Sequence, residues 1–163
     1  SKYVQCAQLM SKPNQAIKLC NSLAAKIKDK VDDFDLILSP AMGGIIVGYE
    51  IGRILSIETI FCERVNKKFT LRRGFSIKKN SRVLIVEDVI TTGKSSLECV
   101  KLIKKFKAKL IGFACLIDRS NNEKIKDKII SQVELEIPTY NKKDLPEQLK
   151  KIPITKPGSR FLR

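Results

Sequence analysis

Two adjacent carboxylates, Glu87 and Asp88, stand shortly before a run of small and hydroxyl-bearing residues at 91–95 (TTGKS). Adjacent acids at the end of a buried strand are costly unless something compensates their charge. The hydroxyls of a sugar would do so, because ionised carboxylates accept hydrogen bonds from O–H groups. The small residues around Gly93 let backbone N–H groups turn toward one point, and such a nest binds anions. The spacing therefore predicts a site as long as one sugar, with a phosphate cradle at its far end.

The flanking residues place this site between a strand and a helix. Residues 83–86 (VLIV) are fully apolar, which is typical of a strand buried on both faces. Residues 95–106 carry Leu97, Val100 and Ile103 at three-residue spacing, which predicts a helix with one apolar face. The positive end of that helix would point at the cradle and favour a phosphate there.

Two other interpretations compete with a sugar-phosphate site. Gly93, Lys94 and Ser95 match the end of a Walker A loop, but that motif requires a glycine where Asp88 stands. A P-loop is therefore excluded. The second alternative is an ordinary strand followed by a threonine-capped helix, with the acids on the surface. The length of the run, in which each part has a use, favours the sugar-phosphate site.

The rest of the chain alternates short β-rich runs with helical stretches. This alternation predicts an α/β fold with helices on both faces of a parallel sheet, in a single domain over residues 1–163. Helices are expected at residues 14–30, 45–55, 95–106 and 122–128, and in a short stretch of the tail; strands are expected at residues 3–9, 36–38, 59–64, 83–86, 110–117 and 133–137. Residues 66–74 are expected to form a hairpin or a mobile loop. Ligands of parallel sheets bind beyond the carboxyl ends of the strands, so the chemistry should lie just after Leu38, Glu63, Val86 and Ile117.

The composition argues against several other functions. The chain has five cysteines without a CxxC pair and no histidine, so neither a zinc site nor Ser-His or Cys-His catalysis is expected. Apolar neighbours of most cysteines predict reduced, buried thiols in a cytoplasmic protein. No apolar run approaches the roughly 20 residues of a membrane-spanning helix.

The net charge of +15 allows two interpretations, a nucleic-acid binder or a lysine-rich solvated surface. The lysines are scattered, and only 6% of the residues are aromatic, which is few for stacking on bases. The second interpretation is favoured, and nucleic acid is not the expected partner. A basic field would still attract a polyanionic small substrate.

Several segments of the chain resemble one family. Residues 86–93 (VEDVITTG) resemble the signature with which type I phosphoribosyltransferases bind 5-phosphoribosyl 1-pyrophosphate (PRPP). The segments that resemble orotate phosphoribosyltransferases are 39–44 (SPAMGG), 61–65 (FCERV), 71–75 (LRRGF), 116–119 (LIDR) and 156–160 (KPGSR). Residues 3–5 (YVQ) resemble the strand that follows that family's N-terminal hood. The resemblance implies the type I phosphoribosyltransferase fold, a central, mostly parallel sheet flanked by helices, with the N-terminal hood largely absent.

The resemblance also implies a reaction. Orotate and PRPP would give orotidine 5′-monophosphate and pyrophosphate, a step of pyrimidine (UMP) biosynthesis, with Mg²⁺ carried on the PRPP and not held directly by the protein. It further implies a cytoplasmic homodimer in which a loop of each subunit reaches the other subunit's site.

Roles for individual residues follow from the same resemblance. Arg64 and Asp88 are the candidate catalytic residues. The candidates for binding PRPP are Glu87, Asp88, Val89, Ile90, Thr91, Thr92, Gly93, Lys94, Ser95, Arg64, Lys67 and Lys68. Within this set, Glu87 and Asp88 would hold the ribose hydroxyls and residues 91–95 the 5′-phosphate.

The base and the leaving group have candidates of their own. Thr91 and Arg119 would contact orotate, whose carboxylate an arginine can grip with two charge-assisted bonds. The expected pyrophosphate loop consists of Ala41, Met42, Gly43 and Gly44. Many relatives carry a lysine at the position of Gly43, a lysine directly after the residue that corresponds to Arg64, and a histidine later in that loop. Because this chain has Val65 after Arg64 and no histidine, Lys67, Lys68, Arg72 and Arg73 are candidates for the missing cations.

Two alternatives to the orotate reaction stay open. One is a phosphoribosyltransferase for a purine or another base. The other is an RNA-binding regulator that keeps the fold without catalysis, which the charge of +15 favours and the complete motif at residues 87–95 disfavours.

Overall fold

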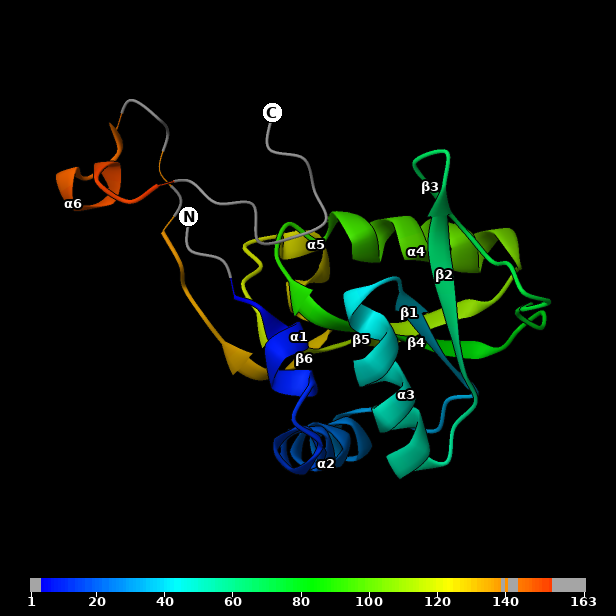
Figure 1. The fold of residues 1–163 in the computed structure, drawn as a ribbon. Coiled ribbons are helices and arrows are strands. Elements are labelled where there is room, and N and C mark those ends of the chain that lie inside the picture. Colours follow the sequence, from blue (N-terminus) through cyan, green and yellow to red (C-terminus); the bar gives the residue numbers. More distant parts are fainter. Residues whose placement is uncertain (1–3, 139, 141–143, 154–163) are drawn as a thin grey trace.

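The computed structural model describes residues 4–138, 140 and 144–153, and a six-stranded sheet forms its centre (Figure 1). The strands are β1 (Leu36–Pro40), β2 (Thr59–Val65), β3 (Lys68–Thr70), β4 (Arg82–Ile90), β5 (Lys109–Asp118) and β6 (Ile129–Glu134), in the spatial order β3-β2-β1-β4-β5-β6. Neighbouring strands are parallel except β2 and β3. The predicted mostly parallel sheet is confirmed.

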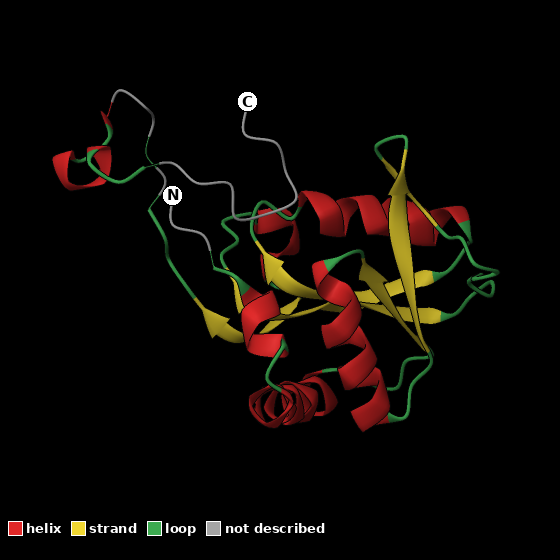
Figure 2. Ribbon diagram, viewed as in Figure 1, coloured by secondary structure: helices red, strands yellow, loops and turns green. Residues whose placement is uncertain are grey.

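Helices cover both faces of this sheet (Figures 1 and 2). They are α1 (Cys6–Met10), α2 (Pro13–Lys30), α3 (Gly43–Leu55), α4 (Lys94–Lys105), α5 (Glu123–Lys126) and α6 (Glu147–Lys150). Helices α1, α2 and α3 lie on one face and α4 and α5 on the other, while α6 lies apart from the sheet. Among the described residues, no helix is both long and apolar enough to cross a membrane.

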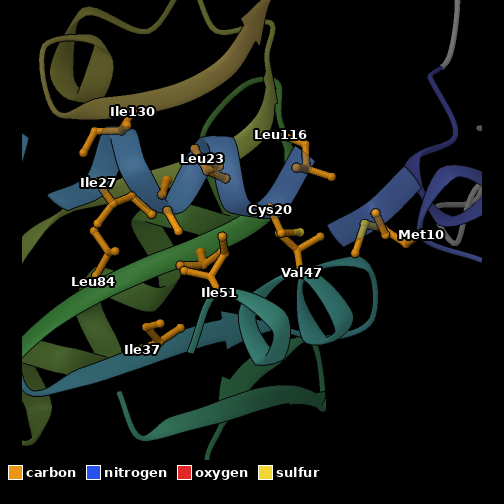
Figure 3. Packing of buried hydrophobic residues seen from close by; sticks show 14 of the residues in the cluster. Met10, Cys20, Leu23, Ile27, Ile37, Val47, Ile51, Leu84, Leu116 and Ile130 are labelled. Atoms are coloured by element: carbon orange, nitrogen blue, oxygen red, sulfur yellow. The ribbon is translucent and has the colours of Figure 1, made fainter. Parts of the chain in front are cut away.

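The alternation of side chains along the central strands divides the core into two clusters. Leu84 and Val86 of β4 pack with the buried faces of α2 and α3, where Cys20, Leu23, Ile27, Val47 and Ile51 meet (Figure 3). Val83 and Ile85, the intervening residues of the same strand, pack on the side of α4. Both faces of β4 are therefore buried, as its apolar run predicts.

Strand β4 is longer than predicted. The expected strand ended at Val86, whereas β4 continues to Ile90 because Glu87, Val89 and Ile90 pair with β5. Glu87 and Asp88 consequently lie inside the strand instead of following it, so their side chains point to opposite faces.

Two of the strand predictions are wrong: one segment forms a helix, and the other strand lies at a different position. The stretch at residues 3–9 contains the helix α1 from Cys6, because Cys6 and Met10 are four residues apart and bury one helical face; Tyr3 lies outside the described residues. The last strand, expected at 133–137, is β6 at Ile129–Glu134, because Ile129 and Ile130 pair with β5.

Residues 66–74 contain a hairpin, one of the two predicted alternatives. Asn66 and Lys67 both have positive φ, 49° and 65°, which is the conformation of a two-residue turn that matches the twist of the flanking strands. The pairing of β2 with β1 ends at Cys62. Residues 63–65 and 68–70 therefore form a two-stranded ribbon that extends past the sheet, and we call it the β2–β3 ribbon.

Gly48 on α3 provides a test of this packing. A Cβ at this position would overlap Ser39 Oγ and lie 3.0 Å from Ser39 Cβ, and Ser39 is fully buried. We expect Gly48→Ala to lower the free energy of unfolding by about 1–3 kcal/mol in urea titrations. Adding Ser39→Ala should recover part of the loss because it removes the overlapping oxygen, and full stability of Gly48→Ala alone would contradict the described helix–sheet contact.

Candidate active site

A small hollow lies where β4 passes into α4. Its volume is about 30 Å³, and it is lined by Glu87, Val89, Ile90, Thr91, Thr92, Gly93, Lys94, Ser95 and Ser96. Gly93 is the N-cap of α4 and has φ of 68°. A Cβ there would overlap Ile125 Cδ1 on α5, so glycine is needed for both conformation and space.

The hollow is suited to an anion. The N-cap residue of α4 has no side chain to occupy the first-turn amides, and that turn carries no acid. The preceding loop is held by Asn122 Nδ2, which donates to Thr92 O at 3.1 Å. Backbone N–H groups at the start of a helix form a ready anion site because the helix dipole adds to their charge. Residues 91–95, which were predicted to cradle a phosphate, are among those that line this hollow.

The two carboxylates of the motif do not meet. Glu87 points to the α4 face, is 7% exposed, and accepts a hydrogen bond from Ser96 Oγ, which is also buried. Its carboxylate is thereby oriented along the wall of the hollow. Ser96 is absent from the residues predicted from the sequence, because a serine one position inside a helix carries no signal until its partner is known.

Asp88 points to the opposite face, toward the turn that begins α3. A Cβ on Gly43 would lie 2.7 Å from Asp88 Oδ1, so the glycine gives this carboxylate its room. Burial raises the pKa of Asp88 above its ordinary value, while the backbone N–H groups of Val89 and Asp88 itself oppose the shift. The structure therefore brings Asp88 to the predicted turn at residues 41–44 and separates it from Glu87.

The turn at residues 41–44 lies at the carboxyl end of β1. Ala41 N donates to Cys62 O at 2.8 Å, which ties the turn to β2. Its first peptide bond, Ala41–Met42, is cis, and Met42 and Gly43 are exposed. Gly43 has no side chain to cover the backbone, so a ligand can approach the amides at this position closely.

Arg119 follows β5 and lies beside the end of β4. Its backbone N donates to Ile90 O at 2.8 Å, which places it next to Thr91 at the end of β4. Its Nε is buried and has no hydrogen-bond partner among the residues that the structure describes. A buried guanidinium donor without a partner is costly, so the position calls for an acceptor.

The cations predicted to meet the pyrophosphate lie on the β2–β3 ribbon and in the segment that follows it. Lys67 and Lys68 are exposed at the tip of the ribbon. Arg72 and Arg73 pair with Glu63, at 3.7 Å and 3.1 Å between charged atoms. Arg64 pairs with Glu98 of α4, a residue that the sequence did not indicate because its role depends on the hairpin.

Comparison with known proteins agrees with this fold. The family model described as a phosphoribosyl transferase domain matches residues 10–146. Among solved structures, an adenine phosphoribosyltransferase from Thermoanaerobacter pseudethanolicus is similar with a TM-score of 0.71 and 19% identity, covering 83% of this chain and 89% of that one. An orotate phosphoribosyltransferase from Aeropyrum pernix has a TM-score of 0.68 and 18% identity, covering 82% and 79%. The class is therefore that of the phosphoribosyltransferases.

Curated relatives identify the family within the phosphoribosyltransferases to which the chain belongs. Orotate phosphoribosyltransferase of Maricaulis maris is 43% identical over 162 residues, which cover 98% of this chain and 84% of the relative. That of Parvibaculum lavamentivorans is 44% identical over the same shares. The chain belongs to the orotate phosphoribosyltransferase family. The predicted type I phosphoribosyltransferase fold is confirmed.

The raised pKa of Asp88 predicts that Asp88→Asn stabilises the folded protein at neutral pH. Because the folded-state pKa exceeds the unfolded-state value, ionisation costs the folded state more, and stability is lost as pH rises through the ordinary aspartate range. Asparagine avoids that cost. We expect a higher melting temperature at pH 7 and a smaller gain at pH 4. The exposed loop carboxylate Asp33 supplies the control, since Asp33→Asn should show no such gain; a lower melting temperature for Asp88→Asn at pH 7 would refute the inference.

Proposed function

We propose that the protein transfers the 5-phosphoribosyl group from PRPP to orotate, giving orotidine 5′-monophosphate and pyrophosphate in UMP biosynthesis. The observation that carries the proposal is the buried, unpaired Nε of Arg119 beside Thr91, at the edge where the cradle also opens. An orotate carboxylate would supply the missing acceptor. Relatives named orotate phosphoribosyltransferase at 43% and 44% identity support the same base.

Each part of PRPP has a matching part of the site. The cradle at residues 91–95, with Lys94 exposed at its rim, receives the 5′-phosphate, and the lining residues Val89 and Ile90 shape its wall. Glu87 and Asp88 accept hydrogen bonds from the ribose hydroxyls. The backbone of Ala41, Met42, Gly43 and Gly44 receives the pyrophosphate, together with Arg64, Lys67 and Lys68 of the ribbon.

Catalysis in this arrangement rests on positioning and on charge. Pyrophosphate leaves the sugar carbon with its electron pair, and positive charge develops on the ribose. The base nitrogen forms the new bond and gives up its proton to the departing pyrophosphate or to solvent. Residues that hold the phosphate and the base at opposite ends align the reacting atoms. Arg64 and the exposed lysines of the ribbon stabilise the departing anion.

Magnesium belongs to this proposal through PRPP. The fit rests on donor type, because the Asp88 carboxylate is an oxygen donor of the kind Mg²⁺ prefers and faces the turn at residues 41–44. When bound, Mg²⁺ neutralises part of the pyrophosphate charge. We assign it no direct protein ligand set.

A homodimer is supported by an apolar surface on α3. Met42, Ile46 and Tyr49 project from it, with side chains 79%, 55% and 65% exposed. Beside them a groove of about 290 Å³ is lined by Ser39, Ile45, Ile46, Tyr49, Thr59, Ile60, Phe61 and Phe75. Projecting side chains next to a hollow on one face suit a two-fold contact with a second copy. Strand β2, which continues into the ribbon, supplies Thr59, Ile60 and Phe61 to this groove.

We also propose that residues 1–163 act as one domain in the cytoplasm. The free, buried state of all five cysteines supports a reducing compartment.

The reaction is tested by incubating the protein with PRPP, Mg²⁺ and orotate, and separately with hypoxanthine, adenine or uracil. We expect product with orotate. Asp88→Asn should lower kcat by roughly tenfold to a hundredfold, the range expected for one lost hydrogen bond to a charged group, without loss of the fold.

Turnover of another base without turnover of orotate would overturn the choice of base. An unchanged rate in Asp88→Asn would remove the ribose role of that carboxylate. The exposed Asp33 again serves as control, because Asp33→Asn should leave the rate unaltered.

The dimer is tested by Tyr49→Glu, which places a charge on the α3 face. We expect a shift from dimer to monomer in sedimentation velocity, because an unpaired charge in an apolar contact is costly. Ile17→Glu on α2, at another exposed apolar side chain, should leave the dimer intact. A dimer that persists in Tyr49→Glu would exclude this face as the contact.

A further inference from the structure

The β2–β3 ribbon needs an anchor beyond its own pairing. Past Cys62, the partner of its first strand is β3 alone. An isolated two-stranded hairpin is marginally stable in water. Its buried member is Phe69, which belongs to the cluster on the α4 side of the sheet, together with Cys99. The ribbon therefore takes its position from contacts with α4.

Arg64 makes the most specific of these contacts. Its Nη1 donates to Glu98 Oε2 on α4 and to Lys67 O at 3.0 Å within the ribbon turn. Its guanidinium carbon lies 4.0 Å from the centre of the Phe69 ring, its cross-strand neighbour. One side chain thus joins the turn, the buried aromatic residue and α4.

The two arginines that follow the ribbon, Arg72 and Arg73, do not connect it to another element. Both pair with Glu63, which lies on β2 itself. Among the ion pairs of the residues that the structure describes, Arg64–Glu98 is the one that joins the ribbon to α4. Glu98 lies one helical turn after Lys94, so this pair is attached to the same helix whose first turn forms the phosphate cradle.

We propose that Glu98 is a positioning residue that holds Arg64 on α4 and competes with the pyrophosphate group for its guanidinium. The proposal rests on the proposed function only in assigning a pyrophosphate-bearing ligand to the site. Arg64 exchanges a carboxylate with one negative charge for an anion with more, and the ribbon is released from α4 as the exchange occurs.

The Arg64–Glu98 ion pair should weaken the binding of pyrophosphate. A ligand that must first break an ion pair binds more weakly than its contacts alone would allow, because the binding-competent state is only a fraction of the population. Removing the charge of Glu98 raises that fraction. Partly exposed ion pairs have modest strength, so the expected gain in affinity is about twofold to fivefold.

The first test is Glu98→Gln, which keeps the shape of the side chain. Binding of inorganic pyrophosphate with Mg²⁺, measured by calorimetry, should become about twofold to fivefold tighter. KM for PRPP should fall by a similar factor while kcat changes less. Unchanged or weaker pyrophosphate binding would overturn the proposal. Because calorimetry needs no orotate turnover, failure of the proposed reaction would leave this result interpretable.

The second test reads the position of the ribbon directly. Trypsin cleavage after Lys67 or Lys68, followed by mass spectrometry, should be faster in Glu98→Gln than in the parent. Glu147→Gln is the matched control, because Glu147 also pairs with a cation but lies on α6, away from the ribbon.

A double variant separates this pair from general loosening of α4. Arg64→Ala alone should speed cleavage, and adding Glu98→Gln should speed it no further, because the ion pair that Glu98→Gln removes is already lost in Arg64→Ala. Additive acceleration, or equal cleavage of parent and Glu98→Gln, would refute the role of the pair.

Discussion

The period-two alternation of side chains along β4 is the constraint on which the site depends. Leu84 and Val86 are held by the cluster beneath α2 and α3, and Val83 and Ile85 by the cluster beneath α4. Because both clusters are buried, the strand cannot rotate or slip by one residue without exposing them. That register extends into the acids and sends consecutive carboxylates to opposite faces of the sheet.

Because Glu87 and Asp88 point to opposite faces of the sheet, the site depends on the helices that cover both faces. Glu87 is set by Ser96 of α4, and Asp88 is set by the glycine-containing start of α3. The cradle and the pyrophosphate turn therefore lie on either side of one strand end. This arrangement has a cost, because Asp88 is desolvated and its pKa is raised. Asp88 thus destabilises the folded state, and it lies beside the turn proposed to bind the pyrophosphate. Such a position is expected where function and stability conflict.

Ion pairs within the protein hold the arginine of the ribbon and the two arginines that follow it. Arg64 is held by Glu98, and Arg72 and Arg73 by Glu63. These pairs are partly exposed, so each is weak enough for a polyanionic ligand to replace. Arg119 differs, because its Nε is buried and without a partner among the described residues. The position proposed for the base thus has an unpaired donor, whereas the donors proposed for the leaving group are already paired.

Local spacing and small residues were sufficient to predict the elements with long apolar patterns and the family. Helix α2, the parallel sheet and the loop at residues 91–95 could all be predicted in this way. The folded chain, in contrast, fixed the partners of single polar side chains, such as Ser96 for Glu87 and Glu98 for Arg64, residues 9 and 34 positions apart. It also decided that residues 6–10 form a helix and that β6 begins at Ile129. Each of these outcomes depends on a contact with a distant segment, which local periodicity does not encode.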